Sequence, residues 1–349
     1  MSEFKVNTIT NRDGSYGPQV CGITTFGSSG MQLPSGPTEM RGGTRGRGVV
    51  AGGSEPSPSG NVNTMEFIEI ATTGNSTDFG DFNQSPYFGG TGFASATRGL
   101  FAGGYNPTAG IVDIGFFTFS SNGGANDFGD MAFRRYYPYS PSDSTRGLIA
   151  GGKTNPVAVN LHSIEFVTMA STGDTSNFGN LIDKRNWGAS VNSPTRGLFG
   201  GGRPLASDNS TYTNIIDFVT IQTKGDALEF GNLVAAGGAM DGCSSTTRGL
   251  WGAKYGGSFT AAIDFVTIAT FGNASDFGDL TRTVFGAGGM SNSIRGVWAG
   301  GQNPDNDPGM NVIDFVTIAT TGNASDFGDL TAPRGYVKGC ADSHGGIGE

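Results

Sequence analysis

The octapeptide TRGLFAGG at residues 97–104 recurs along the chain with small changes. The other copies are RGRGVVAGG at 45–53, TRGLIAGG at 145–152, TRGLFGGG at 195–202, TRGLWGAK at 247–254 and IRGVWAGG at 294–301. Their Arg-Gly pairs begin at Arg47, Arg98, Arg146, Arg196, Arg248 and Arg295. The period is about fifty residues, which indicates a fold assembled from stacked copies of one supersecondary unit.

Each copy is followed by a loop of variable length and then by a segment in which apolar and polar residues alternate. These segments are MEFIEIAT from Met65, VDIGFFTF from Val112, IEFVTMAS from Ile164, IDFVTIQT from Ile216, and IDFVTIAT from Ile263 and from Ile313. Alternation with a period of two, in β-branched and aromatic residues, predicts a strand buried on one or both faces.

A turn with Gly and Asn then leads to DFGD or a close variant, whose phenylalanines we expect at matching core positions. They are Phe79, Phe128, Phe178, Phe230, Phe277 and Phe327. A further segment, such as WGASVNS from Trp187 or FGAGGMSNS from Phe285, precedes the next Arg-Gly pair. Each unit therefore supplies four short strands.

Four short strands in a unit of about fifty residues are typical of a blade of a β-propeller, in which the units pack radially around a channel. The paired glycines that close the second strand permit positive φ and close approach of backbones near the axis. An α/β fold is excluded, because no stretch combines the 3.6-residue period with capping residues over about ten positions. We expect an all-β, six-bladed propeller with four-stranded blades.

The two ends of the repeat region predict how the ring closes. The first Arg-Gly copy, at Arg47, has no inner strand before it, and the last unit stops before any further Arg-Gly copy. Pairing the segment from about Gly335 to Ser343 with the strand from Arg47 to Gly53 completes one blade. The propeller then spans residues 44–349.

Residues 1–43 share none of the repeat vocabulary and are expected to form a separate N-terminal arm. KVNTIT at 5–10 and VCGITTF at 20–26 each predict a short strand, and PSGP at 34–37 indicates a stiff exit into the ring. We expect this polar arm to dock on another protein.

Composition excludes several classes of function. The chain of 349 residues has 61 glycines, and its 21 Lys plus Arg against 30 Asp plus Glu give a net charge of −9, the wrong sign for wrapping a phosphate backbone. No window approaches the roughly 18 apolar residues of a membrane span, and the first residues lack the apolar stretch of a signal peptide. Cys21, Cys243 and Cys340 form no close pair, and His162 and His344 cannot build a histidine-rich metal centre. Free, buried thiols are expected at Cys243 and Cys340.

The repeated arginines allow two interpretations, a cationic ring around the channel or a set of bidentate pairs that staple strands or blades. We favour the second, because each Arg has a carboxylate or amide counterpart one unit away. The counterparts are Asp81, Asp130, Asn180, Asn232, Asp279 and Asp329. The aromatic residues that follow the Arg-Gly pairs are expected in the core, and they are Phe101, Phe199, Trp251 and Trp298.

The sequence offers little catalytic chemistry. It has no G-x-S-x-G elbow and no histidine near a recurring Ser or Cys, so we predict no catalytic residue and no cofactor. Ser76, Asp78 and Gly80 fit the start of the aspartate box of sialidase propellers, but no Trp follows. A pair of carboxylates for glycoside hydrolysis could still meet in three dimensions.

Two further patterns are better explained by turns. Asn303, Asp305, Asn306 and Asp307 could offer oxygens to calcium, but the distal bidentate Glu is missing and the neighbouring prolines favour an ordinary turn, so we predict no metal. The N-x-S/T sequons at Asn75, Asn273 and Asn323 are interpreted as turn formers.

The loops after the double glycine and the links between units differ among the copies, whereas the other turns barely change. In an antiparallel four-stranded blade these loops and links emerge on one side, so diversity there indicates specific contacts. Tyr and Arg are enriched at the energetic centres of interfaces, and Tyr stacks on sugar rings. The candidate residues for binding a partner or glycan are Tyr105, Arg134, Arg135, Tyr136, Tyr137, Arg185, Arg203, Tyr212, Lys254, Tyr255, Arg282 and Arg334.

With RGLFAGG and the four-strand unit, the ring resembles the kelch-like propellers, whose hallmark is an apolar strand ending in Gly-Gly. The later strands depart from kelch, because IDFVTIAT and DFGDL replace the regular Tyr and Trp. The chain also resembles the Gly-rich repeat proteins of marine tailed phages that infect cyanobacteria, through the arm residues Lys5 to Ile9 and Gly22 to Phe26. The copper site of galactose-oxidase-type kelch proteins cannot be carried over, because the two histidines do not match it.

The phage resemblance implies a virion protein of the tail or a fibre, assembled in the host cytoplasm. Its expected partners are other virion proteins, held through the arm, host-surface polysaccharide and further copies of the chain, with no nucleic acid and no membrane insertion. Two alternatives stay open, a capsid decoration protein and a propeller enzyme that cleaves glycans.

Overall fold

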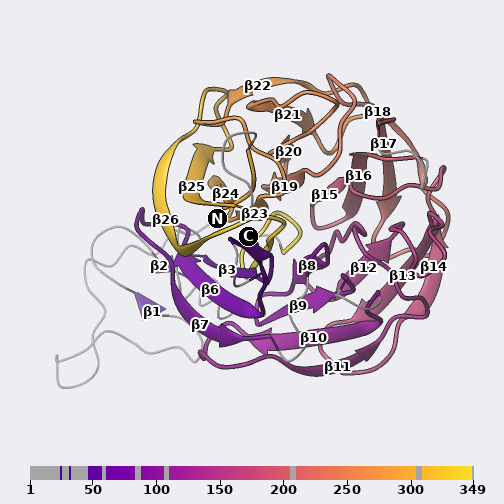
Figure 1. Cartoon of the computed structure of the whole chain (residues 1–349), viewed down its shortest axis with the longest axis horizontal. Coiled ribbons are helices and arrows are strands. Elements are labelled where there is room, and N and C mark those ends of the chain that lie inside the picture. The colour runs from indigo at the N-terminus through magenta and orange to yellow at the C-terminus, as the bar shows by residue number, and fades with distance from the viewer. Residues whose placement is uncertain are drawn as a thin grey trace, which may run out of the picture.

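The computed structural model is a ring of six β-sheets around a central axis (Figure 1). It describes residues 24–25, 31–32, 46–56, 60–82, 88–105, 110–204, 210–303 and 309–347. All regular secondary structure within these residues is β-strand. The prediction of an all-β, six-bladed propeller is confirmed.

Each blade runs from an inner strand at the axis to a fourth strand at the rim (Figure 1). Blade 1 contains β27 (Lys338–Ala341), β3 (Arg47–Ala51), β6 (Thr64–Glu69) and β7 (Thr77–Asp81), and blade 2 contains β8 (Thr91–Ala94), β9 (Arg98–Ala102), β10 (Asp113–Thr118) and β11 (Asn126–Asp130). Blade 3 contains β12 (Arg146–Ala150), β13 (Ser163–Thr168) and β14 (Ser176–Asn180), and blade 4 contains β15 (Ala189–Asn192), β16 (Arg196–Gly202), β17 (Thr213–Thr220) and β18 (Leu228–Asn232). Blade 5 contains β19 (Asp241–Ser244), β20 (Arg248–Gly252), β21 (Ala262–Thr267) and β22 (Ser275–Asp279), and blade 6 contains β23 (Gly288–Ser291), β24 (Arg295–Ala299), β25 (Met310–Thr317) and β26 (Ser325–Arg334).

Two pairs of short strands lie outside the blades. Strands β4 (Ser54–Glu55) and β5 (Gly60–Asn61) pair in the loop that follows β3. Strands β1 (Thr24–Thr25) and β2 (Met31–Gln32) pair within the predicted arm. The rest of the arm, including the strand predicted at 5–10, lies outside the described residues.

The inner strand of blade 3 is irregular because of two prolines. Residues 139–142 occupy its place and pair with β12 through the bridges Tyr139↔Ala150 and Ser142↔Gly147. Pro141 has no N–H to donate to the ladder, although its carbonyl still accepts the N–H of Leu148 at 3.0 Å. The blade therefore keeps four layers of chain with three regular strands.

The ring closes by pairing the two ends of the repeat region, as predicted. Strand β27 lies antiparallel to β3, with Lys338 opposite Ala51 and Ala341 opposite Gly48. Just beyond β27, Asp342 Oδ1 accepts the backbone N–H of Arg47 at 2.9 Å across 295 positions of sequence. In blade 3 the same bond runs between Asp143 and Arg146, only three positions apart. In blade 1 the two ends of the repeat region therefore meet where the other blades have a continuous turn between their first two strands.

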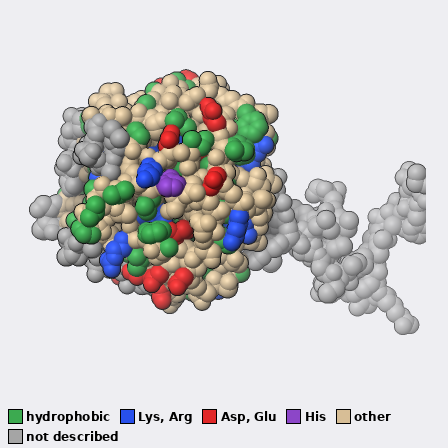
Figure 2. All heavy atoms as spheres, turned by 90° about the vertical axis from the view of Figure 1, so that its right-hand side faces the viewer, with side chains coloured by type: hydrophobic (Ala, Val, Ile, Leu, Met, Phe, Trp, Pro, Cys, Tyr) green, Lys and Arg blue, Asp and Glu red, His purple; other side chains and the backbone are tan. Residues whose placement is uncertain are grey.

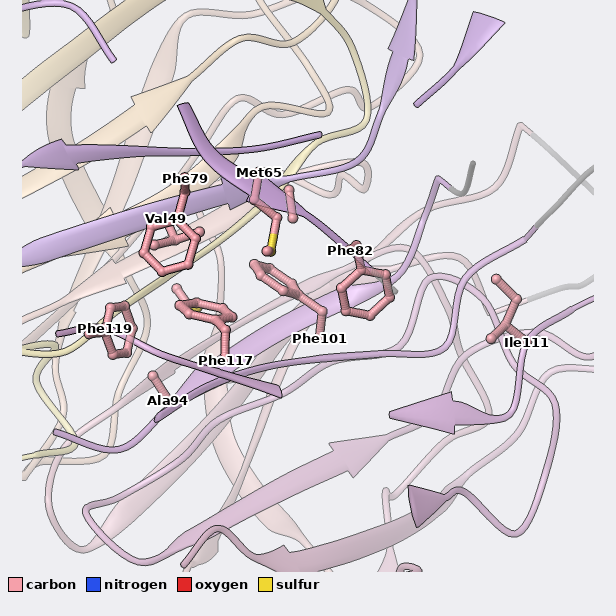
Figure 3. Packing of buried hydrophobic residues seen from close by; sticks show 11 residues of the cluster. Val49, Met65, Phe79, Phe82, Ala94, Phe101, Ile111, Phe117 and Phe119 are labelled. Atoms are coloured by element: carbon pink, nitrogen blue, oxygen red, sulfur yellow. The ribbon is translucent and has the colours of Figure 1, made fainter. Parts of the chain in front are cut away.

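The core consists of six clusters of buried apolar side chains, each formed between neighbouring blades. Figure 3 shows the cluster between blades 1 and 2, in which Val49, Met65 and Phe79 face Phe101 and Phe117. The six phenylalanines of the DFG segments and the four aromatics after the Arg-Gly pairs are all buried, as expected. Cys243 and Cys340 are buried free thiols.

The arginines of the Arg-Gly pairs do staple neighbouring blades, but the predicted partners are wrong. Each guanidinium lies 4.3–5.2 Å from the ring of a phenylalanine on the third strand of its own blade. From there it donates to a backbone carbonyl of the next blade, not to the Asp or Asn series. The bonds are Arg47 to Phe119 (2.7 Å), Arg98 to Met169 (3.0 Å), Arg146 to Ile221 (2.9 Å), Arg196 to Ile268 (2.9 Å), Arg248 to Ile318 (3.1 Å) and Arg295 to Ile70 (3.2 Å).

The fourth strand of each blade is covered by the turn between the third and fourth strands of the next. Gly123 N donates to Phe79 O at 2.8 Å and Ala125 N to Asp81 O at 2.9 Å, and this pair of bonds recurs around the ring. The approach is so close that a Cβ on Gly80 would lie 2.6 Å from the backbone of Gly123. These bonds occupy backbone groups on the outer edges of the fourth strands, which hinders pairing of those edges with another chain.

The same turns carry a side-chain clamp. Asn75, Asp174, Asp226, Asn273 and Asn323 each accept a backbone N–H from the fourth strand of the preceding blade at 2.8–3.1 Å. This confirms the interpretation of the sequon asparagines as turn residues. In blade 2 the equivalent residue is Gly124, which has no side chain to offer.

Candidate functional site

The described residues of the variable loops and of the links between blades lie on one face of the ring, as the sequence predicted. In every blade the residue after the double glycine, or its counterpart, pairs with a residue of the link that enters the blade. The bridges are Ser54↔Gly335, Phe88↔Tyr105, Tyr136↔Lys153, Asn186↔Arg203, Gly238↔Tyr255 and Phe285↔Gln302. We call this side of the propeller the loop face.

One residue of each link reaches the axis with a left-handed backbone. These six residues, the axial ring, are Gly89, Tyr137, Trp187, Ala239, Gly286 and Tyr336, with φ between 52° and 69°. Neighbours are joined by backbone hydrogen bonds, from Tyr137 N to Gly89 O, from Trp187 N to Tyr137 O, from Ala239 N to Trp187 O and from Gly286 N to Ala239 O. A non-glycine residue in this conformation costs about 1 kcal/mol or more, yet three of the six are aromatic.

The axial ring closes the channel at the loop face. Beneath it lies a cavity of about 10 Å³, lined by the ring and by Lys338. That volume admits no more than about one water molecule. Lys338 Nζ is held by Asp241 Oδ2 at 3.2 Å. Ligands on this face therefore meet a floor and not a pore.

The floor is made of aromatic rings in contact with one another. Trp187 lies 5.3 Å from Tyr137 and 6.4 Å from Tyr336, centroid to centroid, and Phe285 lies 5.8 Å from Tyr336. All but Phe259, which is exposed, are half-buried, so their outer edges and faces remain accessible. We call this set the aromatic floor, and its members are Phe88, Tyr105, Tyr136, Tyr137, Trp187, Tyr212, Tyr255, Phe259, Phe285 and Tyr336.

Two cations border the floor on blades 3 and 4. The Arg203 guanidinium lies 3.5 Å from the ring centroid of Trp187, and its Nη2 donates to Tyr212 Oη at 2.6 Å. Its backbone carbonyl accepts from Asn160 Nδ2 at 2.9 Å. Lys153 Nζ lies 6.0 Å from the ring of Tyr136. Arg203 is therefore fixed in place from both its side chain and its backbone.

Burial sets the protonation of the floor. It raises the pKa of the Tyr136 and Tyr137 hydroxyls above the usual value of about 10, so both keep their O–H in alkaline solution as well as at physiological pH. Burial lowers the pKa of Lys153, and the positive charge of Arg203 lowers it further. The two cations thus repel each other across the edge of the floor.

Several predicted site residues are not at the surface, and for these the prediction is wrong. Arg135, Arg185, Arg334 and Lys254 are buried, and Arg282 is mostly buried. Each is paired with an acidic residue on the third strand of a blade. The pairs are Arg135–Glu165, Arg185–Asp217 (3.0 Å), Lys254–Asp264 (2.8 Å), Arg282–Asp314 (2.6 Å) and Arg334–Glu66 (2.5 Å). A carboxylate that is buried on the third strand must be paired with a cation, so these side chains turn into the ring and do not face solvent.

Two blades depart from this pattern of a buried acid paired with an arginine of the link. Blade 2 carries Gly115 where the other blades carry the acid, and the link that enters it has no arginine. In blade 5 the link has Gly237 at the arginine position, and the stem of Lys254 fills that space. These cations therefore stabilise the ring and are unavailable to a ligand. Arg134 is exposed, and its Nη1 donates to Gly110 O at 3.1 Å.

The structure brings Tyr105, Tyr136, Tyr137, Arg203, Tyr212 and Tyr255 together at the floor, as a shared face predicted. Sequence reasoning missed Phe88, Trp187, Phe259, Phe285 and Tyr336. Trp187 and Phe285 were read as the start of inner strands. Trp187 and Tyr336 could have been found from their shared position in the link, because each lies seven residues after the last residue of DFGD or its variant.

The channel below the floor is lined by inner strands rich in serine and holds a cavity of about 50 Å³. Its far end is filled by the segment after β27. His344 Nε2 donates to Ala94 O at 2.8 Å, and Nδ1 accepts from Asn192 Nδ2 at 2.8 Å. Burial lowers the pKa of His344 to about 4, so the imidazole is neutral at physiological pH.

Other kinds of site find no support in the part of the chain that the structure describes. It contains no group of three His, Cys, Asp or Glu residues placed to hold a metal, and Asp305, Asn306 and Asp307 lie outside it. It also contains no helix able to cross a membrane. Figure 2 shows one side of the ring, where acidic, basic and apolar side chains are interspersed.

No protein-family model matches the chain, and no curated protein matches it.

Proposed function

We propose that this protein is a structural and binding protein of a phage particle, in the tail or a fibre, whose loop face binds a carbohydrate of the host surface. The observation that carries the binding role is the aromatic floor. Half-buried rings on a closed face present flat apolar surfaces edged by tyrosine hydroxyls. A pyranose ring offers the complement, an apolar C–H face with hydroxyls around its rim.

The strained backbone of the axial ring supports the same role. Gly89, Ala239 and Gly286 fill three of its positions with small residues, so the fold itself needs no aromatic side chain there. Tyr137, Trp187 and Tyr336 nevertheless adopt the left-handed conformation that small residues adopt more cheaply. Strain retained at the centre of a variable face favours a binding function over a purely structural one.

A binding role is favoured over glycan cleavage by the state of the acidic residues. Glu66, Glu165, Asp217, Asp264 and Asp314 are each buried and paired with a cation beneath the loop face. A retaining or inverting glycosidase needs two carboxyl groups that reach the sugar. The virion assignment rests on the resemblance of the arm residues and the kelch-like Gly-Gly strands described above, with the arm as the expected attachment to the particle.

The experiment is a binding assay with purified protein and host-envelope polysaccharide, combined with a measurement of reducing ends. Tyr137→Ala with Trp187→Ala should weaken binding at least about tenfold, because stacking area is lost at the centre of the floor. The folded ring should persist, because Ala239 already occupies an equivalent position with φ 52°.

Asn273→Ala, at the other end of the strands, is the matched control and should bind like the unmodified protein. Unchanged binding by the double variant would refute the site. Release of reducing ends by the purified protein would replace the binding role with an enzymatic one.

A further inference from the structure

We infer that the loop face selects an anionic oligosaccharide, whose sugar rings stack on Tyr136 and Tyr137 while its charged groups lie near Lys153 and Arg203. This inference rests on the proposed function and names the chemical class of its ligand. It starts from position. Lys153 and Arg203 follow the double glycines of adjacent blades, where the other blades carry Ser54, Tyr105, Tyr255 and Gln302.

The two cations flank one continuous strip of aromatic surface. Lys153 lies over Tyr136, Tyr136 contacts Tyr137 at 5.1 Å, Tyr137 contacts Trp187 at 5.3 Å, and Arg203 lies over Trp187. A sugar ring placed on the middle of the strip would have a cation at each end. Both cations are half-buried, so their charges are poorly screened by solvent.

The charge arrangement is unusual for this protein. The chain has a net charge of −9, and the buried cations under the loop face each have a carboxylate partner within 3.0 Å. Among the described residues no carboxylate lies within ion-pair distance of Lys153, although the positive charge of Arg203 acts on it. A bound anion would remove that repulsion, which gives an acidic ligand an advantage over its neutral analogue.

The shape of Arg203 fits this task. Its guanidinium carbon lies 3.5 Å from the ring centroid of Trp187, its Nη2 donates to Tyr212, and its backbone carbonyl is held by Asn160, which is itself bonded to Asn186 at 2.7 Å. A guanidinium held in this way places a fixed, delocalised positive charge at one end of the strip, whereas Lys153 adds a point charge at the other end. Two cations on an acidic protein are too few for a polyphosphate chain, which needs a longer basic track.

The test is a panel of three classes of oligosaccharide measured by calorimetry at low and high salt. Maltohexaose and cellohexaose represent neutral sugars, trigalacturonate and sialyllactose carry carboxylates, and a carrageenan oligosaccharide carries sulfates. We expect at least one anionic class to bind about tenfold more tightly than the neutral sugars in about 50 mM salt, with the difference shrinking as salt rises. The two anionic arms identify the charged group.

Variants separate this inference from the proposed function. Lys153→Gln and Arg203→Gln should each weaken the anionic ligand about tenfold more than they weaken neutral sugars, and Arg203→Lys should recover part of the difference. Lys224→Gln removes the same charge from an exposed turn at the other end of the strands and should change neither. Binding of neutral sugars alone, or equal binding of both classes, overturns the anionic selectivity and leaves the carbohydrate function standing. Binding of no sugar class refutes both.

Discussion

The ion pair between Arg185 and Asp217 allows a quantitative test of how the ring is stabilised. Arg185 Nη2 and Asp217 Oδ2 are 3.0 Å apart, and both side chains are fully buried. Arg185→Met keeps most of the volume but leaves a buried carboxylate without its cation, at a cost of about 3–5 kcal/mol. A ring of about 300 residues has an unfolding entropy of about 0.6 kcal/mol/K, so the melting temperature should fall by about 5–8 °C.

The pH dependence of that variant has a definite sign. Burial raises the pKa of Asp217 above its usual value, and Arg185 counteracts part of the rise. Without Arg185 the folded-state pKa rises further. A carboxyl whose pKa is higher in the folded state destabilises the fold when ionised, and this penalty is absent below the unfolded pKa of about 3.9. The loss of unfolding free energy caused by Arg185→Met should therefore be largest at neutral pH and should shrink as the pH falls through the raised pKa of Asp217.

A double variant supplies the control. Asp217→Asn keeps an oxygen for the N–H of Ile182, now 3.2 Å from Asp217 Oδ2, and removes the charge. Arg185→Met with Asp217→Asn should lie within about 1 kcal/mol of the unmodified protein, although each single change costs several. Calorimetry and urea unfolding at pH 7 and pH 5 measure these differences. Additive single effects, or a cost below about 1 kcal/mol for Arg185→Met, would refute the view that the pair is isolated from water.

Three other predictions concern the closure of the ring, the segment after β27 that contains His344, and the side-chain clamps between blades. Removing residues 336–349 exposes the edge of β3 and should lower the melting temperature of the whole ring by about 10 °C in one transition, whereas unchanged melting would contradict the closure. The pKa of His344 is lowered to about 4, so its stabilisation is complete at neutral pH and is lost as the pH falls from about 6.5 through 4. His344→Gln should remove about 3 kcal/mol of that pH dependence in acid titrations followed by calorimetry. Gly124→Asn adds the clamp that blade 2 lacks and should stabilise the ring by about 0.5–1 kcal/mol in urea unfolding, because the added oxygen can accept Asp81 N; destabilisation would show that the turn cannot hold a side chain.

The architecture was predictable because every level of the sequence repeats. The unit of about fifty residues, with its alternating strand and its DFG phenylalanine, occurs six times, so an ambiguous copy can be interpreted by alignment with the other five. The closure followed from the missing strand before Arg47. The irregular strand at 139–142 was also readable in principle, since Pro138 and Pro141 cannot donate to a ladder.

Side-chain partners were harder to predict because they depend on the stagger between blades. Arg98 had Asp130 as a plausible partner in sequence, but the guanidinium lies over Phe116 and reaches Met169 O. Exposure in the links was equally hidden, since Arg134 and Arg135 are neighbours and only the second is buried. The axial ring depends on a left-handed backbone at one link position, which no residue type reveals when Trp187 and Gly286 both adopt it.

The pairing of β27 with β3 has a consequence for how the chain is made. Arg47 and its capping partner Asp342 are 295 positions apart, so a ribosome adding about 5–20 residues per second completes the first blade about 15–60 s after starting it. During that interval β3 presents an unpaired inner edge, and the segment after β27 that fills the far end of the channel has not yet been synthesised. The five later blades have all four layers of chain before then, so release of the finished chain, and not the folding of any single blade, sets the moment at which the ring becomes stable.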